Sequence, residues 1–196
     1  MKSLDDFIIK PVNGRYNNSV DVDGTDLILN TEIFNHQYVN REAEVLAVPA
    51  AYDSEVKVGD LVIVHHNVFR RWTNIRGEEK NSKSYYKEDM YFVKTDQIFL
   101  YKRDNEWNAP KGCCFVKPLH QIDEFSIDKE RPLIGIIKHV DPLLEGINKD
   151  DLVGFTPYSE YEFVVDGERM YRVWTNDISI KYEYQGDEEE YNPSWT

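Results

Sequence analysis

The sequence predicts an all-β protein composed of two tandem small β-barrels. The chain has 13% aromatic residues, and Val and Ile are prominent beside them, a composition that suits strands better than helices. Short apolar runs alternate with turns that contain Gly, Pro, Asn or Asp, as in small barrels. Four sequence blocks also recur in the same order in the two halves of the 196-residue chain.

Two strand-like runs form the centre of the first half. Residues 43–48 are followed by a Pro-containing link, and residues 56–64 contain a turn at Gly59-Asp60. Apolar side chains that alternate along short strands can be buried only in the core of so small a domain. The expected core of this half consists of Val45, Leu46, Val48, Val62, Ile63, Val93, Ile98 and Leu100.

The second half repeats the first, block by block. The matched segments are 7–12 with 114–119, 43–48 with 135–140, 56–64 with 147–155, and 90–95 with 170–175. In the third pair, Asp150 stands where the first half has Gly59. Any one match could arise by chance, but four in the same order indicate two copies of one β module.

The repeat predicts a first domain over residues 1–107 and a second over 108–196, each of roughly 100 residues. We expect the segment 85–101 to form a closing hairpin in the first domain. In the second domain, residues 158–173 predict a hairpin on an Asp-Gly turn, and residues 186–190 are a solvated acidic run. The expected second core consists of Ile136, Val153, Phe155, Val173, Ile178 and Ile180.

Composition excludes several functional classes. The net charge of −13 makes the chain a poor candidate for binding nucleic acid, which needs a surface rich in Lys and Arg. No run of about 18 apolar residues predicts a membrane span, and residues 2–6 are too acidic for a signal peptide, so we expect a cytoplasmic protein. The only cysteines, Cys113 and Cys114, are neighbours and predict no disulfide framework.

No catalytic or metal-binding pattern stands out. His65 and His66 are adjacent and would point to opposite faces of a strand, and His36, His120 and His139 add no ligand spacing. A phosphate loop, a nucleophile elbow and a Cys–His pair are all missing from the sequence. We therefore expect neither an enzyme nor a bound metal or cofactor.

The connection over residues 20–40 is unusually long. It carries an apolar triplet, Leu27-Ile28-Leu29, between Gly24 and a polar tail. Loops beyond about 12 to 15 residues are usually functional or disordered, so the triplet either docks on a partner or forms a short strand folded onto the barrel. The counterpart in the second half, residues 123–130, has no apolar triplet, so only the first half carries a candidate docking loop.

Taken together, these segments of the first half resemble the GroES co-chaperonin (chaperonin-10-like) family. The segments that carry the resemblance are 7–11, 24–29, 41–48, 56–63 and 96–100. The resemblance covers about half of the chain, and the second half enters through its similarity to the first. It implies a GroES-like β-barrel that forms a seven-membered ring and closes a GroEL-like chaperonin as a lid during protein folding.

In that family each subunit lends the chaperonin a flexible loop whose apolar triplet binds a groove between helices of the apical domain. Carried over by position, the triplet is Leu27, Ile28 and Leu29. Because seven is odd, two equivalent copies per chain cannot tile such a ring. We expect the first copy to make the ring and the second to lie outside its plane. A divergent, doubled co-chaperonin would suit a virus that folds its structural proteins with the host chaperonin.

The alternative is a doubled β module with a structural or assembly role, for example in a virus particle, and no contact with a chaperonin. The segment 20–40 distinguishes the two hypotheses. A mobile segment with an exposed triplet favours the co-chaperonin, and a segment packed as a strand favours the structural protein.

Overall fold

The computed structural model describes residues 2–17, 19–28, 35–123, 125–183, 186 and 188–192. This part of the chain is all-β, as predicted, and its helical turns are 3-10 turns of three residues. The chain forms two compact units, Met1–Glu106 and Trp107–Thr196. Among the described residues, no helix has the length and apolar character needed to cross a membrane.

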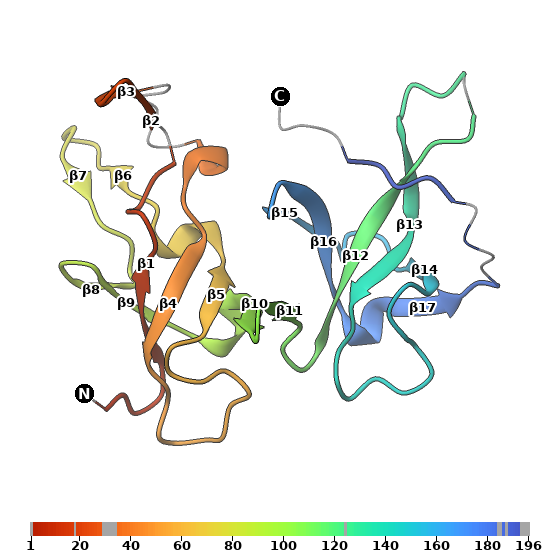
Figure 1. The fold of residues 1–196 in the computed structure, drawn as a ribbon, viewed down its shortest axis with the longest axis horizontal. Helices are drawn as coiled ribbons and strands as arrows, with labels where there is room; N and C mark the ends of the chain where they lie inside the picture. Colours follow the sequence, from red (N-terminus) through yellow and green to blue (C-terminus); the bar gives the residue numbers. More distant parts are fainter. Residues whose placement is uncertain are drawn as a thin grey trace. The chain divides into compact units, whose positions relative to one another are not determined.

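Unit 1 is built on a seven-stranded sheet with the order β11-β10-β5-β4-β1-β9-β8, in which the edge strand β11 begins at Glu106, the last residue of the unit (Figure 1). Its strands are β1 (Phe7–Pro11), β4 (Glu42–Ala47), β5 (Leu61–Val64), β8 (Tyr85–Lys87), β9 (Met90–Val93), β10 (Ile98–Arg103) and β11 (Glu106–Asn108). The 3-10 turn η3 (Thr95–Gln97) links β9 to β10. Two small hairpins lie outside this sheet, β2 (Ser19–Val22) with β3 (Thr25–Ile28) and β6 (Trp72–Thr73) with β7 (Glu79–Lys80).

Unit 2 is built on a six-stranded sheet with the order β15-β16-β12-β13-β14-β17. Its strands are β12 (Cys113–His120), β13 (Glu130–His139), β14 (Leu152–Phe155), β15 (Tyr161–Val165), β16 (Glu168–Trp174) and β17 (Ile178–Lys181). The 3-10 turn η4 (Thr175–Asp177) links β16 to β17, just as η3 links β9 to β10.

The two units share one strand order and one register. The order β10-β5-β4-β1-β9-β8 of unit 1 corresponds strand by strand to β17-β14-β13-β12-β16-β15 of unit 2. The corresponding cross-strand pairs are Phe7–Val93 with Cys114–Val173, Ile8–Phe92 with Phe115–Arg172, and Ile9–Tyr91 with Val116–Tyr171. A register shift follows Ile8 in one unit and Phe115 in the other. The sequence repeat therefore corresponds to a repeat of the strand pairing, and the register shift falls at the equivalent position in both units.

The turn before the second core strand is the same in both units. Gly59 and Asp150 both have a positive φ, 90° and 67°, and each donates its N–H to a carbonyl of the preceding strand at 2.8 Å. The next residue, Asp60 or Asp151, accepts the backbone N–H three positions earlier, at 2.8 and 2.7 Å. Asp tolerates the left-handed region better than most residues, so the exchange of Gly for Asp preserves the turn.

Most of the expected core of unit 1 is confirmed. The buried members are Val45, Val62, Ile63, Val93, Ile98 and Leu100. The prediction for Leu46 and Val48 is wrong in degree, since both are only half-buried. Successive side chains of a strand point to opposite faces, and β4 turns Val45 and Ala47 inward, so Leu46 faces the other side. Val48 follows the end of the strand and packs against the margin of the core.

In unit 2, the expected core residues Ile136, Val153, Phe155 and Val173 are buried, and Ile178 is half-buried. The prediction for Ile180 is wrong, because 49% of this residue is exposed. Its strand, β17, lies at the edge of the sheet, whereas the matching strand β10 lies between β5 and β11. The two cysteines are buried in β12 and form no disulfide.

The hairpin over 158–173 is confirmed, because β15 and β16 pair across Asp166 and Gly167, whose φ angles are 50° and 79°. The closing hairpin over 85–101 is wrong. There β8 pairs with β9, but β10 leaves to pair with β5. Strand pairing in the described residues closes neither main sheet into a barrel, since each sheet has two edge strands.

His139 gives unit 2 a pH-dependent stability. Burial lowers the pKa of this imidazole to about 4, and its ring lies 6.2 Å from that of Phe115. The unfolded imidazole takes up a proton near pH 6.5 and the folded one does not, so stability is lost as pH falls from about 6.5 to 4. Urea unfolding at pH 7 and at pH 5 measures how much the free energy of unfolding of unit 2 falls between the two pH values. We expect this decrease to be roughly 1 to 2 kcal/mol smaller in His139→Gln than in the natural protein. Identical losses would contradict this assignment.

Candidate functional site

The hairpin β2–β3 lies in the long connection between β1 and β4, and Figure 1 shows it beyond the ends of these strands. Its register runs from Ser19–Ile28 to Val22–Thr25. The two turn residues, Asp23 and Gly24, have φ angles of 53° and 80°, as a type I′ turn requires. In the described residues its strands pair only with each other.

The described part of the predicted triplet is exposed. Leu27 is 55% and Ile28 62% exposed, and Val22 in the facing strand is 50% exposed. Leu29 lies outside the described residues. The segment thus forms a strand but is not joined to the main sheet, a combination of the two alternatives that the sequence left open. An isolated two-stranded hairpin is marginally stable in water, so burial of its aliphatic side chains on another surface would stabilise it.

The base from which the hairpin projects is fixed. Asn17 donates its backbone N–H to the carbonyl of Tyr38 at 2.7 Å, which brings the two ends of the connection together. Asn40 is buried, and its side-chain amide donates to the carbonyl of Gly14 at 2.7 Å and accepts the N–H of Glu42 at 2.9 Å. These bonds tie the end of β1 to the start of β4.

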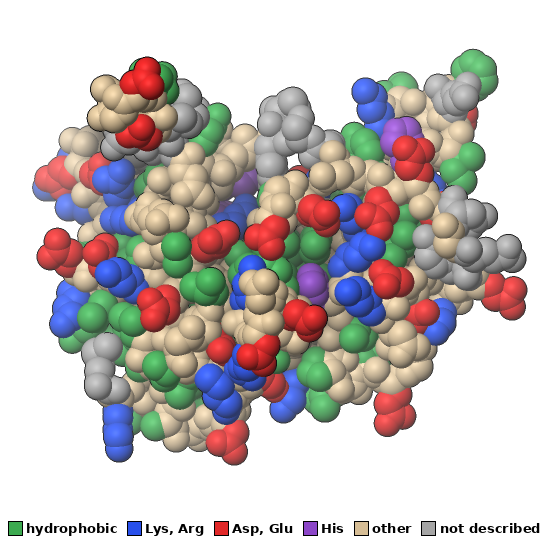
Figure 2. Space-filling model, in the orientation of Figure 1, with side chains coloured by type: hydrophobic (Ala, Val, Ile, Leu, Met, Phe, Trp, Pro, Cys, Tyr) green, Lys and Arg blue, Asp and Glu red, His purple; other side chains and the backbone are tan. Residues whose placement is uncertain are grey.

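The corresponding connection of unit 2, between β12 and β13, also exposes apolar side chains. Ile122, Phe125 and Ile127 are 72%, 93% and 98% exposed, and Figure 2 shows hydrophobic side chains at the outer end of this loop. This loop has no continuous apolar triplet, as the sequence indicates, but it exposes three separate apolar side chains. The three residues are separated by polar ones, so a search for a continuous triplet missed them.

Hydrogen bonds shape this second loop. Asp123 accepts the N–H of Phe125 on its side chain and that of Ser126 on its carbonyl, both at 3.0 Å. Gln121 donates its backbone N–H to the carbonyl of Lys129 at 2.9 Å and closes the base. The described residues of the loop are thus held in a turn that presents Phe125 outward.

The histidines do not lie as the sequence predicted. His65 and His66 are not on opposite faces of a strand, because His66 begins the 3-10 turn η2 (His66–Val68) and the two rings stack at 4.4 Å. The ring of His36 lies 5.3 Å from that of His66. Burial, and then the positive charges of His65 and Arg41, lower the pKa of His66 to about 3. Within the described ranges no group of three or more His, Cys, Asp or Glu residues could hold a metal.

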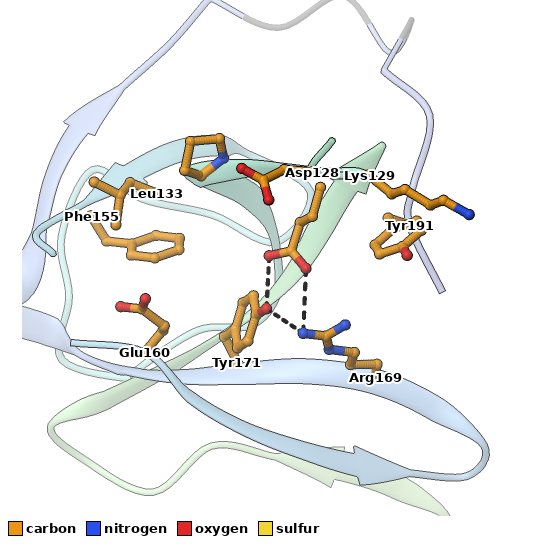
Figure 3. A pocket seen from close by; sticks show the side chains of 10 residues that line it. Asp128, Lys129, Leu133, Phe155, Glu160, Arg169, Tyr171 and Tyr191 are labelled. Carbon is orange, nitrogen blue, oxygen red and sulfur yellow. Dashed lines mark hydrogen bonds and ion pairs between the residues drawn. The ribbon is translucent and has the colours of Figure 1, made fainter. Parts of the chain in front are cut away.

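A cavity of about 320 Å³ in unit 2 brings together polar groups that lie far apart in the sequence (Figure 3). Tyr171 donates to Glu130 at 2.7 Å and accepts from Arg169 at 2.7 Å, and the guanidinium lies 3.4 Å from the same carboxylate. In Figure 3, Phe155 and Leu133 line the opposite side. Burial raises the pKa of Glu130 and that of Tyr171.

Most of these polar groups satisfy one another, although the Nε of Arg169 is buried without a hydrogen-bond partner in the described chain. The Tyr171 hydroxyl uses its proton on Glu130, and Arg169 also lies 3.0 Å from the carboxylate of Glu162. The network ties the start of β13, where the second loop ends, to the β15–β16 hairpin. We therefore interpret it as a structural network that holds the base of this loop. The exposed hairpin of unit 1 is a stronger candidate site than this cavity, because its apolar groups are left in contact with water.

Neither protein-family models nor curated proteins give a match to this sequence. The geometry of the hairpin and of its supporting sheet therefore carries the functional argument.

Proposed function

We propose that the protein is a co-chaperonin-like lid that binds a GroEL-like chaperonin through the segment 20–40 and assists protein folding. The observation that carries this proposal is the exposure of Leu27 and Ile28 on a hairpin that pairs with no other strand of the described chain. Leu27 shares one face of the hairpin with the exposed Val22, and Ile28 lies on the other face, so each face offers aliphatic surface to an apolar groove on a partner. Burying each is worth about 1.5 to 3 kcal/mol, less the cost of ordering the hairpin.

The proposal includes two GroES-like barrels. One support is the strand order that the two units share. Another is the pair of 3-10 turns η3 and η4, which join β9 to β10 and β16 to β17, the strands between which each barrel would close. A small barrel supplies the rigid base that a docking hairpin needs, and the bonds of Asn40 supply its attachment.

The proposal also includes a homo-oligomeric ring. Main sheets with unpaired edge strands offer backbone groups that neighbouring chains would pair. One hairpin per chain gives a ring as many docking sites as it has subunits, so modest single affinities combine into firm binding. Light scattering at micromolar concentration should give the mass of a ring, of seven chains if the resemblance holds in full. The mass of a single chain would contradict the ring.

A pull-down with a bacterial chaperonin, with and without ATP, tests the function. We expect retention that depends on nucleotide and on the hairpin. The matched control is a variant with Ser at Ile122, Phe125 and Ile127, which removes three more exposed apolar side chains from unit 2. Retention that survives in this control but is lost in a variant with Ser at Leu27, Ile28 and Leu29 would support specific docking. Absence of retention in either nucleotide state would reject the proposal.

The alternative function is a structural or assembly protein, for example of a virus particle. The second exposed loop favours it, because two apolar loops in equivalent places give each chain two sites at which copies could join. In that case the Ile122, Phe125 and Ile127 variant would lower the mass measured by light scattering, and no chaperonin would be retained.

A further inference from the structure

A cavity of about 570 Å³ in unit 1 is lined by positively charged residues, although the chain as a whole has a net charge of −13. It lies between the residues that follow β5 and those that precede β8, and Arg70, Trp72 and Lys83 line it together with hydroxyl and amide side chains. Among its described lining residues there is no Asp or Glu, although the chain contains 36 of them. The face shown in Figure 2 carries acidic and basic side chains intermixed, so a cavity whose described charged residues are all cations is distinctive.

Arg70 lacks an acceptor within the described chain. Its guanidinium forms neither a hydrogen bond nor an ion pair there, and its Nε is buried. The Nε of the neighbouring Arg71 is also buried without a hydrogen-bond partner, but the guanidinium of Arg71 forms an ion pair with Glu79, whereas that of Arg70 forms none in the described chain. A buried donor without an acceptor is unfavourable, and the oxygen atoms of a bound anion would satisfy it. Lys83, exposed at the same cavity, would add a second positive charge.

Trp72 provides a flat apolar surface at the same place. Its residue is 48% exposed, and its indole N–H donates to the carbonyl of Asn81 at 3.2 Å. This bond satisfies the polar edge of the ring and fixes its orientation. The hydroxyl of Ser82 donates to the carbonyl of Val68 and holds the two walls together. A site ordered before its ligand arrives loses less entropy on binding.

We propose that this cavity binds a small organic anion that carries a flat ring, with a nucleoside monophosphate as the simplest probe. The phosphate would accept hydrogen bonds from Arg70 and Lys83, and the ring would stack on Trp72. The volume lies within the range of about 300 to 1,000 Å³ that is usual for small-molecule sites. The net charge of −13 opposes a long polyanion, but a small anion responds mainly to charges within a Debye length of about 8 to 10 Å.

Calorimetry on the full chain at about 0.1 M salt tests the proposal with AMP, adenosine and inorganic phosphate. We expect AMP to bind at least roughly tenfold more tightly than either fragment, since it alone uses both the cations and the ring. Arg70→Gln and Trp72→Ala should each weaken AMP binding by about tenfold. The matched controls are Arg76→Gln, an exposed arginine outside the cavity, and Trp174→Ala, a tryptophan of unit 2 that is 47% exposed. Both should bind AMP as the natural protein does.

The proposal would be overturned if AMP does not bind at millimolar concentration, or if it binds no more tightly than phosphate. Unchanged affinity in the Arg70 and Trp72 variants would also overturn it, once circular dichroism shows that they fold. If Arg70→Gln does not fold, the exposed Lys83→Ala replaces it, with an expected weakening of about threefold. The hairpin plays no part in these measurements, so their outcome is independent of chaperonin binding.

Discussion

Replacement of Leu27, Ile28 and Leu29 by Ser is expected to abolish chaperonin binding and to leave unit 1 folded. The two described members of the triplet are more than half exposed, so they contribute little to the core. Each Ser removes about 1.5 to 3 kcal/mol of apolar burial in the complex, and the loss is multiplied over the subunits of a ring. Retention on an immobilised chaperonin in the presence of ATP measures the effect.

The control for this experiment is the folded state of the variant. The unfolding midpoint of unit 1 should stay within a few degrees of its original value, because changes at exposed sites usually cost less than about 0.5 kcal/mol. Binding that persists in the triple variant would remove the docking role from the hairpin. A variant that no longer folds would show that the triplet supports the core instead.

Replacement of Gly135 by Ala is expected to destabilise unit 2 by about 3 kcal/mol, the upper end of what overpacking usually costs. A Cβ atom at this position would lie 2.5 Å from both the backbone oxygen of Lys117 and a methyl group of Val116. The corresponding residue of unit 1 is Ala43, which is buried opposite Pro11 as Gly135 is opposite Pro118. One copy of the module therefore accepts a methyl group that the other excludes.

Thermal unfolding measures this difference. A loss of about 3 kcal/mol lowers the midpoint of a domain of this size by roughly 10 °C or more. The matched control is Gly154→Ala in the neighbouring strand, where the new Cβ would approach the partly exposed ring of Tyr182 at 3.2 Å and push aside a side chain instead of the backbone. Equal effects of the two substitutions would contradict the steric explanation.

The sequence predicts much of the fold because local patterns determine it. Alternating apolar residues specify the strands, and the repeat aligns them so closely that Phe7 and Cys114 take equivalent partners, Val93 and Val173. The turn at Gly59 and Asp150 was likewise recognisable, since both residue types accept a positive φ.

Other features depend on the order of the strands, which local patterns do not specify. Ile180 aligns with the buried Leu100, but it lies on an edge strand and is exposed. Glu130 and Tyr171 are 41 residues apart in the sequence and meet only in the folded sheet. The cavity at Arg70 combines residues from three separate segments of unit 1. The positive charge of this cavity could not be predicted from the composition, because the chain is acidic overall.

Hydrogen exchange of the free and chaperonin-bound protein tests the docking role of the hairpin most directly. Amides of residues 19–28 should exchange quickly in the free protein, because β2 and β3 pair only with each other in the described chain. In the presence of chaperonin and ATP these amides should become protected, while those of β12 to β17 keep their rates. The docking role would be contradicted if the hairpin amides already exchange slowly in the free protein, or if they exchange equally fast with the chaperonin bound.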